Sequence, residues 1–266
     1  MKKIDATQLK EIQLQILTEV DFFCKAKNIK YCLAYGTLIG AIRHKGYIPW
    51  DDDIDIVMLR PDFERFISSF SASNSRYKVI CNELQSDCYY PFAKVLDTKT
   101  VLYEPDENGV KLCVNIDLFA YDAVPDRTSG NKLNRKLAKF NFLNVVQFKL
   151  YRSKKWYKRI PKLILHHILK LYPKGYFASK IVKNARKYEE IGLSQYVGGF
   201  TSVGDGLCDR SVFDSYILKE FEGREYPVPI GYDVWLTAIY GDYMQLPPVE
   251  KRITHHTFKA YIDENA

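Results

Sequence analysis

The chain has 266 residues, of which 47% are apolar, and a formal net charge of +7. This length and composition allow one large domain or two small ones with a buried core, and they exclude a disordered chain. No stretch approaches twenty uninterrupted apolar residues, so we expect no membrane-spanning helix. The first residues run into charged sequence instead of an apolar signal core, which predicts a cytoplasmic protein.

The six cysteines include no C-x-x-C pair. Zinc sites normally use such closely spaced ligands, and disulfide frameworks are typical of short secreted chains. We therefore expect reduced cysteines, most of them inside the protein. They are Cys24, Cys32, Cys81, Cys88, Cys113 and Cys208.

The charge is distributed unevenly along the chain. Eighteen Lys and Arg residues lie between Arg127 and Lys187, where no Asp or Glu occurs. The rest of the chain contains the other 21 basic residues and all 32 acidic ones, so it carries a net charge of −11. An acidic body that carries a segment of charge +18 implies a partner for that segment.

The first predicted element is a helix from Asp5 to Asn28. Asp5 and Gln8 fit a capping box, and apolar residues recur after them with helical spacing. The next elements, in chain order, are a buried strand over 29–34, a Gly36-Thr37 turn, a short helix over 38–43, a loop over 44–50, an acidic strand over 51–57 and a helix that begins near Pro61.

Strands are predicted through the middle of the chain, where β-forming runs alternate with Asn, Asp and Gly. The basic segment has a helical pattern, with breaks at Pro161 and at 173–175. A last helix ends at Gly241. Together these elements indicate an α+β core with a basic helical insertion. The predicted strands are 77–80, 92–96, 101–103 and 114–119, and the last helix is 232–240.

An acidic run follows the first loop. Asp51, Asp53 and Asp55 alternate with other residues, and on a strand this spacing places all three on one face. Carboxylates so close repel one another, and a divalent cation turns that repulsion into binding. Hard oxygen ligands favour Mg²⁺ or Mn²⁺ over zinc. The alternative is a solvated acidic turn, which the apolar residues around the run disfavour.

Asp117 lies between apolar residues in a strongly β-forming stretch. A lone carboxylate there is costly without a charged partner, and the metal of the acidic run would supply one. Asp122 is read as a cap or turn residue. The Gly36-Thr37 turn precedes a helix, so its N–H groups suit an anion such as phosphate, although an ordinary turn is the alternative. Arg43 and His44 either neutralise a diphosphate or lie on the surface.

Three blocks of the sequence resemble the LicD family of phosphotransferases, whose relatives include the fukutin-type proteins. The resemblance implies a nucleotidyltransferase-like mixed sheet flanked by helices. It also implies three parts: a catalytic core over 1–126, a basic helical segment over 127–190, and a C-terminal part over 191–266 that completes the site. The three blocks are 35–55, 116–119 with Pro125-Asp126, and 240–248 with His255-His256 beyond.

The resemblance also implies roles for individual residues. Asp53, Asp55 and Asp117 match the catalytic carboxylates of the superfamily, and Asp51 is a further metal ligand. Thr37 takes the position of the superfamily's Ser. No zinc is carried over, because the clustered cysteines of some animal relatives are missing. The candidates for substrate binding are Gly36, Thr37, Arg43, His44 and Lys94.

Members of the family are associated with moving phosphocholine from CDP-choline to a hydroxyl of surface polysaccharides, teichoic acids or lipopolysaccharide. Other members use other phospho-polyol donors. The resemblance thus implies a Mg²⁺- or Mn²⁺-dependent transfer from a CDP-alcohol to a glycan, with release of CMP. The alternatives are nucleotidyl transfer with release of pyrophosphate, and a non-catalytic adaptor for membranes or nucleic acid. The sequence does not say which aromatic residues hold the donor's alcohol.

Residues 156–165 combine Lys and Arg with Trp, Tyr and long aliphatic side chains. This mixture suits an interfacial helix on anionic lipid, so we expect contact with the inner face of the cytoplasmic membrane, where a lipid-linked acceptor would be assembled. Nucleic acid attracts the same charges and is the rival partner, but we expect none. A solvated helical face is the remaining alternative.

Overall fold

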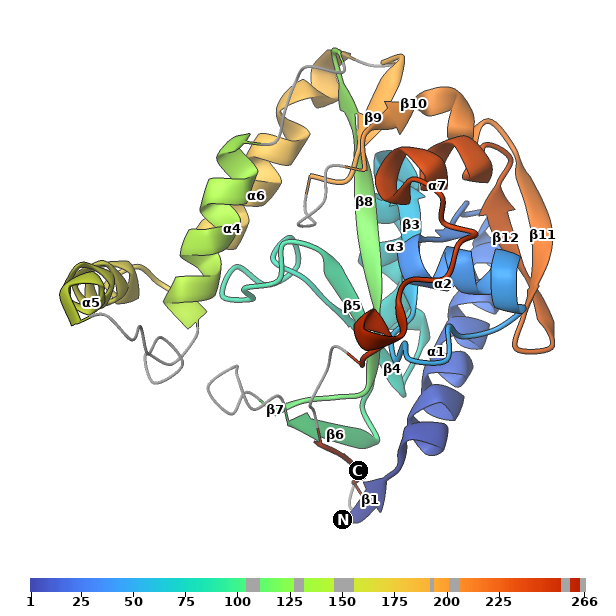
Figure 1. Cartoon of the computed structure of the whole chain (residues 1–266), viewed down its shortest axis with the longest axis horizontal. Helices are drawn as coiled ribbons and strands as arrows, with labels where there is room; N and C mark the ends of the chain where they lie inside the picture. Colours follow the sequence, from blue (N-terminus) through green and yellow to red (C-terminus); the bar gives the residue numbers. More distant parts are fainter. Residues whose placement is uncertain are drawn as a thin grey trace.

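The computed structural model describes residues 1–103, 111–126, 132–145, 156–191, 194–200, 206–254 and 259–263. It places a mixed sheet between two layers of helices, with the basic segment projecting from one side (Figure 1). All six cysteines lie in the described part and are free thiols. Among the helices of that part, none combines the length and the apolar character needed to span a membrane.

A seven-stranded sheet forms the centre of the fold. Its longest strand, β8 (Asn115–Val124), pairs parallel with β3 (Asp55–Leu59) and antiparallel with β5 (Ala93–Asp97) and β9 (Tyr196–Gly198). Parallel and antiparallel pairs in one sheet, together with the helices, confirm the predicted α+β class with a mixed sheet. The other three strands are β2 (Cys32–Leu33), β4 (Tyr77–Ile80) and β10 (Cys208–Asp209).

Two long helices cover one face of this sheet. α1 (Ala6–Lys27) begins at the predicted capping box, in which Gln8 N–H donates to Asp5 Oδ1 at 2.8 Å and Asp5 N–H donates to Gln8 Oε1 at 3.2 Å. α3 (Arg60–Ser73) packs beside it, because the Phe23 ring of α1 lies 5.1 Å from the Phe70 ring of α3. These apolar faces supply much of the core.

The opposite face of the sheet carries α2 (Tyr35–Ile39), a π-helical turn (Gly40–His44) and α7 (Tyr232–Tyr240) (Figure 1). The fully buried Trp235 of α7 packs against Tyr35 and Tyr121, with ring centroids 5.9 and 5.5 Å apart. Gly241, with φ of +69°, ends α7 where the sequence predicts.

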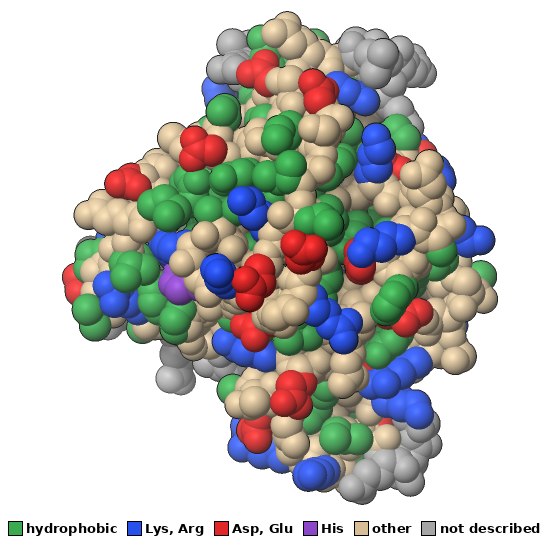
Figure 2. Space-filling view, turned by 90° about the vertical axis from the view of Figure 1, so that its right-hand side faces the viewer, with side chains coloured by type: hydrophobic (Ala, Val, Ile, Leu, Met, Phe, Trp, Pro, Cys, Tyr) green, Lys and Arg blue, Asp and Glu red, His purple; other side chains and the backbone are tan. Residues whose placement is uncertain are grey.

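Two smaller sheets complete the body. β1 (Lys2–Ile4), β13 (Lys259–Ile262), β6 (Thr100–Tyr103) and β7 (Lys111–Leu112) form the first, so the two ends of the described chain pair with each other. β11 (Tyr216–Phe221) and β12 (Arg224–Pro229) form a hairpin. Figure 2 shows the side of the molecule that carries this hairpin, where acidic and basic side chains are mixed. Short 3₁₀ turns occur at Arg210–Phe213 and Val249–Lys251.

The basic segment contains α4 (Lys132–Val145), α5 (Trp156–Lys170), α6 (Tyr176–Ala185) and a 3₁₀ turn (Arg186–Ile191). The predicted break at Pro161 is wrong, because α5 continues through it. Pro161 lies near the helix start and forfeits one intrahelical hydrogen bond, which the rest of the helix tolerates. The break at 173–175 is confirmed, since Gly175 precedes α6 with φ of +80°.

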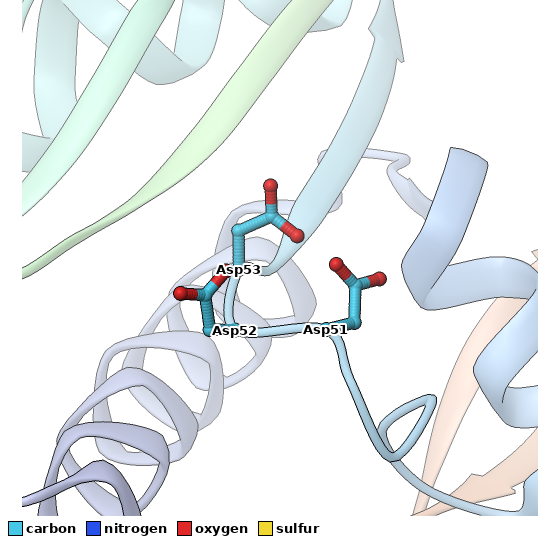
Figure 3. A group of neighbouring side chains, drawn as sticks. All are labelled: Asp51, Asp52 and Asp53. Atoms are coloured by element: carbon cyan, nitrogen blue, oxygen red, sulfur yellow. The ribbon is translucent and has the colours of Figure 1, made fainter. Parts of the chain in front are cut away.

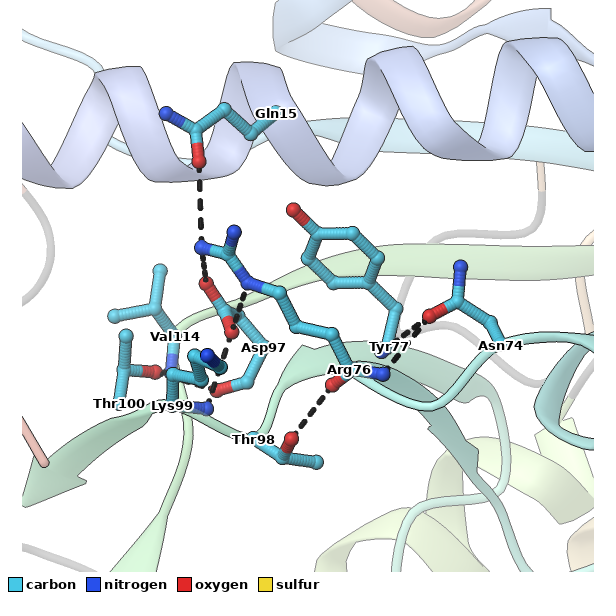
Figure 4. A network of polar contacts seen from close by, with 9 residues as sticks. All are labelled: Gln15, Asn74, Arg76, Tyr77, Asp97, Thr98, Lys99, Thr100 and Val114. Carbon is cyan, nitrogen blue, oxygen red and sulfur yellow. Dashed lines mark hydrogen bonds and ion pairs between the residues drawn. The ribbon is translucent and has the colours of Figure 1, made fainter. Parts of the chain in front are cut away.

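A buried carboxylate secures the edge of the sheet next to α1 (Figure 4). Asp97 is 0% exposed and accepts hydrogen bonds from Arg76 Nε at 3.0 Å, from Arg76 Nη2 at 2.7 Å and from Lys99 N–H at 3.1 Å. The same Nη2 donates to Gln15 Oε1 of α1 at 3.3 Å. This network ties the β5–β6 turn to the helix that lies under the candidate site.

Candidate functional site

A row of charged side chains crosses three neighbouring strands. Asp55 of β3 is in register with Asp117 of β8, and Asp117 is in register with Lys94 of β5. Residues in register on neighbouring strands project from the same face of a sheet. Lys94 Nζ lies 2.6 Å from Asp117 Oδ1 and 3.1 Å from Asn115 Oδ1, and Lys94 is only 7% exposed. The fold therefore positions two carboxylates and a buried ammonium together.

The acidic strand predicted over 51–57 begins later, because β3 starts at Asp55. The alternation argument is therefore wrong for Asp51 and Asp53, which lie in the bend before the strand. The cause is the short neighbour on this side. β2 offers only Cys32 and Leu33 for pairing, and the chain then turns at Tyr35, whose φ is +46°. On the β2 side the pairing therefore ends at Asp55, whose carbonyl accepts a hydrogen bond of 3.0 Å from Ala34 N–H.

The bend nevertheless gathers the acidic side chains. Asp51 and Asp53 turn their carboxylates to the same side of it, whereas that of Asp52 points to the side of α1 (Figure 3). One carboxylate oxygen from each of the three residues lies within 4.8 Å of the others. The sequence prediction missed Asp52 as a possible ligand, because an ideal strand would have directed it away from its neighbours.

Electrostatics connect the bend with the row on the sheet. Burial, then the charge and hydrogen bond of Asp53, raise the pKa of Asp51 to about 7. Burial raises the pKa of Asp55 well above its usual value, and the charges of Asp53, Asp117 and Asp51 raise it further. These carboxylates thus form one repelling cluster. A set of hard oxygen donors of this kind fits Mg²⁺ or Mn²⁺.

The Gly36-Thr37 segment supports the cluster. It forms the first turn of α2 instead of a separate turn before a helix. Thr37 is 3% exposed, and its Oγ1 accepts a hydrogen bond of 2.9 Å from Asp55 N–H, so it fixes the first residue of β3. A Cβ on Gly36 would lie 2.5 Å from Asp51 Oδ2, so only glycine allows this carboxylate its present position.

We expect Gly36→Ala to impair the site without harming the fold. Gly36 has a helical backbone with no positive φ, and the only side chain that the new methyl group meets is the mobile end of Asp51. Alanine also favours a helix by about 1 kcal/mol over glycine. Melting temperature should therefore hold or rise, while Mg²⁺ affinity measured by calorimetry falls about tenfold, the effect of one displaced charged ligand. Unchanged Mg²⁺ affinity would contradict this.

Arg43 and His44 lie at the end of the π-helical turn. Arg43 Nη1 donates to the backbone carbonyls of Tyr243 and Gln245, the latter at 3.3 Å, so this guanidinium holds the segment that follows α7. Arg43 Nε donates to His44 Nδ1 at 3.4 Å. Burial and the charge of Arg43 lower the pKa of His44, which favours the neutral ring at pH 7. His255 and His256 lie outside the described residues.

Two further residues at the site escaped sequence reasoning. Gln13 of α1 is 4% exposed; its Nε2 donates to the Asp52 carbonyl at 2.9 Å, and its Oε1 accepts from Tyr47 OH at 3.0 Å. A polar residue on the apolar face of α1 was the available signal. Tyr240 of α7 is the other, because burial and then the charge of Asp55 raise its pKa. Nothing in the sequence distinguishes it among twenty tyrosines.

Known proteins resemble this chain over the residues of this site. Residues 28–145 match the family model described as "LicD/FKTN/FKRP, nucleotidyltransferase domain". The chain is 35% identical over 274 residues to the lipopolysaccharide cholinephosphotransferase LicD of Haemophilus influenzae, an alignment that covers 98% of this chain and 100% of that protein. An uncharacterised protein of Rickettsia typhi is 34% identical over 98 residues, which are 34% of this chain and 32% of that one.

Proposed function

This chain belongs to the LicD family of phosphotransferases, and from that premise we propose that it transfers phosphocholine from CDP-choline to a hydroxyl of a lipopolysaccharide precursor and releases CMP. The observation that carries the proposal is the cluster of Asp51, Asp53, Asp55 and Asp117 beside Lys94. The relative from Haemophilus influenzae, similar over its whole length, is named for choline phosphate transfer to lipopolysaccharide. A teichoic acid would offer the same kind of hydroxyl.

We assign the metal ligands to Asp51, Asp53, Asp55 and Asp117, and the ion to Mg²⁺ or Mn²⁺. When bound, it supplies positive charge beside the donor's diphosphate. The acceptor hydroxyl attacks the phosphorus that carries choline; a P–O bond to the acceptor forms, and the P–O bond to CMP breaks. CMP leaves with the electron pair. Asp117 accepts the hydroxyl proton, and Lys94, at 2.6 Å, holds that carboxylate in place.

Product analysis tests this proposal. The folded protein is incubated with Mg²⁺, a deacylated lipopolysaccharide core as acceptor and each of CDP-choline, CDP-ethanolamine, CDP-glycerol and CDP-ribitol. Release of CMP is expected with CDP-choline, and EDTA should abolish it. Pyrophosphate formed from CTP and phosphocholine would instead indicate the nucleotidyl transfer that the same carboxylates also suit. No turnover with any CDP donor would overturn the proposal and favour a non-catalytic adaptor.

Tyr240 is our candidate for the contact with the choline head group. Tyr240 is half exposed, and burial, then the charge of Asp55, raise the pKa of its phenol, which places it beside the acidic cluster where the donor's phosphates would bind. A cation–π contact contributes about 0.5–2 kcal/mol. We therefore expect Tyr240→Ala to raise the inhibition constant of phosphocholine roughly tenfold, while Tyr240→Phe leaves it nearly unchanged. CMP is the matched control inhibitor, and an equal loss of CMP binding would contradict this role.

We also propose a location at the inner face of the cytoplasmic membrane, with a lipid-linked acceptor and no nucleic-acid partner. The support is the charge pattern, because eighteen basic residues occupy a segment without an acidic one. A polybasic surface of this kind is attracted to anionic lipid headgroups.

A further inference from the structure

A groove of about 620 Å³ lies between α4 and α6 in the basic segment, where the two helices run side by side (Figure 1). Its floor is aromatic. The Phe177 ring packs against Tyr172 and Tyr176, each with ring centroids 5.2 Å away, and against Phe140 at 5.9 Å. Phe177 is buried, whereas Tyr172 and Tyr176 are exposed. The groove therefore presents amphipathic rings to the solvent.

One edge of the groove is cationic. Lys180, Lys183 and Lys187 line it from α6 and the turn that follows, and their spacing of three and four residues places them on one helical face. All three are exposed, and Lys180 Nζ lies 5.2 Å from the centroid of the Tyr176 ring. The surrounding sequence contains no acidic residue from 127 to 187. This edge thus attracts an anion.

α5 adds an aliphatic stripe. Ile164, Leu165 and Ile168 are 55, 37 and 48% exposed on one side of the helix, and Leu171, directly after the helix end, is 82% exposed. The other side is turned inward, since Leu169 is 4% exposed. Leu171 is followed directly by Tyr172, so the stripe continues along the chain into the groove. Exposing four neighbouring aliphatic side chains to water costs free energy, so these side chains favour an apolar environment.

We propose that the α5 stripe and the α4–α6 groove together form a docking surface for an anionic phospholipid bilayer. The aliphatic stripe enters the boundary between headgroups and acyl chains, the tyrosines lie at headgroup level, and the three lysines contact lipid phosphates. Charge complementarity selects the partner. The stripe argues against nucleic acid, because phosphate and base contacts leave exposed aliphatic side chains in water.

Flotation with vesicles tests this surface, without CDP-choline or metal, so its outcome is independent of the transfer reaction. Vesicles of phosphatidylcholine alone are compared with vesicles that contain 30 mol% phosphatidylglycerol, at low and high salt. Binding to the anionic vesicles should be at least tenfold stronger and should weaken with salt, since the lysines are attracted to the anionic headgroups and salt screens that attraction. Equal recovery on both kinds of vesicle would overturn the proposal.

Matched variants locate the contact. The triple substitution Lys180→Gln, Lys183→Gln and Lys187→Gln should lower binding to anionic vesicles at least tenfold, and Leu171→Asp should do the same. The controls are Lys2→Gln with Lys27→Gln and Lys30→Gln, which removes the same charge, and Leu218→Asp, which alters an aliphatic residue 53% exposed on β11. Equal losses in the controls, or binding of the wild type to oligonucleotides but not to vesicles, would overturn the proposal. Melting temperatures verify folding of every variant.

Discussion

Replacing Asp55 with Asn should reduce phosphocholine transfer by about 10³-fold, equivalent to about 4 kcal/mol of transition-state stabilisation, while the metal-free protein becomes more stable to heat. The two effects have one cause. Burial and the charges of Asp53, Asp117 and Asp51 raise the pKa of Asp55 well above its usual value, so its negative charge opposes folding when no cation is present. Asparagine keeps the shape and removes that charge, together with a metal ligand.

The sign of the stability effect follows from proton binding. Between the ordinary carboxyl pKa near 4 and the raised value in the folded protein, the folded state binds more protons than the unfolded state. The stability of the metal-free wild type therefore falls as pH rises through this window. Asp55→Asn should remove part of that fall, so the two proteins should differ little at pH 4 and most at pH 7.

Thermal unfolding with EDTA and CMP release with Mg²⁺ measure the two effects. Asp117→Asn is the informative comparison, because it also removes a carboxylate but takes the negative charge away from the 2.6 Å contact of the 7%-exposed Lys94. That variant should lose activity and stability together. Mg²⁺ should raise the melting temperature of the wild type more than that of either variant. Full activity of Asp55→Asn, or a lower melting temperature in EDTA, would refute this account of the cluster.

Local sequence signals predicted the elements whose boundaries depend on local chemistry. The capping box before α1 and the glycine after α7 each satisfy orphaned backbone groups within a few residues, so both helix ends were predictable. The alignment of Asp55 with Asp117 was implied by the family resemblance, and the register of β3 and β8 has them side by side. The two helix ends need no knowledge of distant partners, whereas the alignment of the two carboxylates came from the resemblance and not from a local signal.

The remaining features depend on partners far away in the sequence. Arg43 looked like a phosphate ligand, yet its guanidinium donates to carbonyls two hundred residues later. Asp122 was read as a cap or turn residue, and that prediction is wrong, because β8 continues to Val124 and Arg60 supplies the charge that lets a carboxylate lie inside a strand. The periodicity of a sequence carries no information about contacts between residues so far apart in the chain.

Asp122→Ala should cost about 3–5 kcal/mol of stability, the usual result of leaving a buried charge unpaired. Arg60 Nε lies 2.6 Å from Asp122 Oδ1, Arg60 Nη2 lies 2.9 Å from Asp122 Oδ2, and the two side chains are 6 and 3% exposed. Arg60 Nη1 also lies 2.8 Å from Glu83, which in turn binds Arg186 at 2.9 Å. Alanine would remove the bidentate partner and leave the buried guanidinium with Glu83 as its remaining ion-pair partner.

Urea unfolding of two further variants separates this effect from ordinary surface electrostatics. Glu220→Ala removes a partner of Lys45 in an ion pair of 3.4 Å whose side chains are 48 and 73% exposed, and it should cost less than about 1 kcal/mol. The double substitution Arg60→Met and Asp122→Leu removes both buried charges and leaves Glu83 paired with Arg186, so it should recover most of the loss. If Asp122→Ala destabilised the protein as little as Glu220→Ala does, the buried pair would not anchor β8 to α3.

The same loss should also loosen the basic segment, because Arg186 belongs to the turn after α6. Faster amide exchange in α6 of Asp122→Ala would show this.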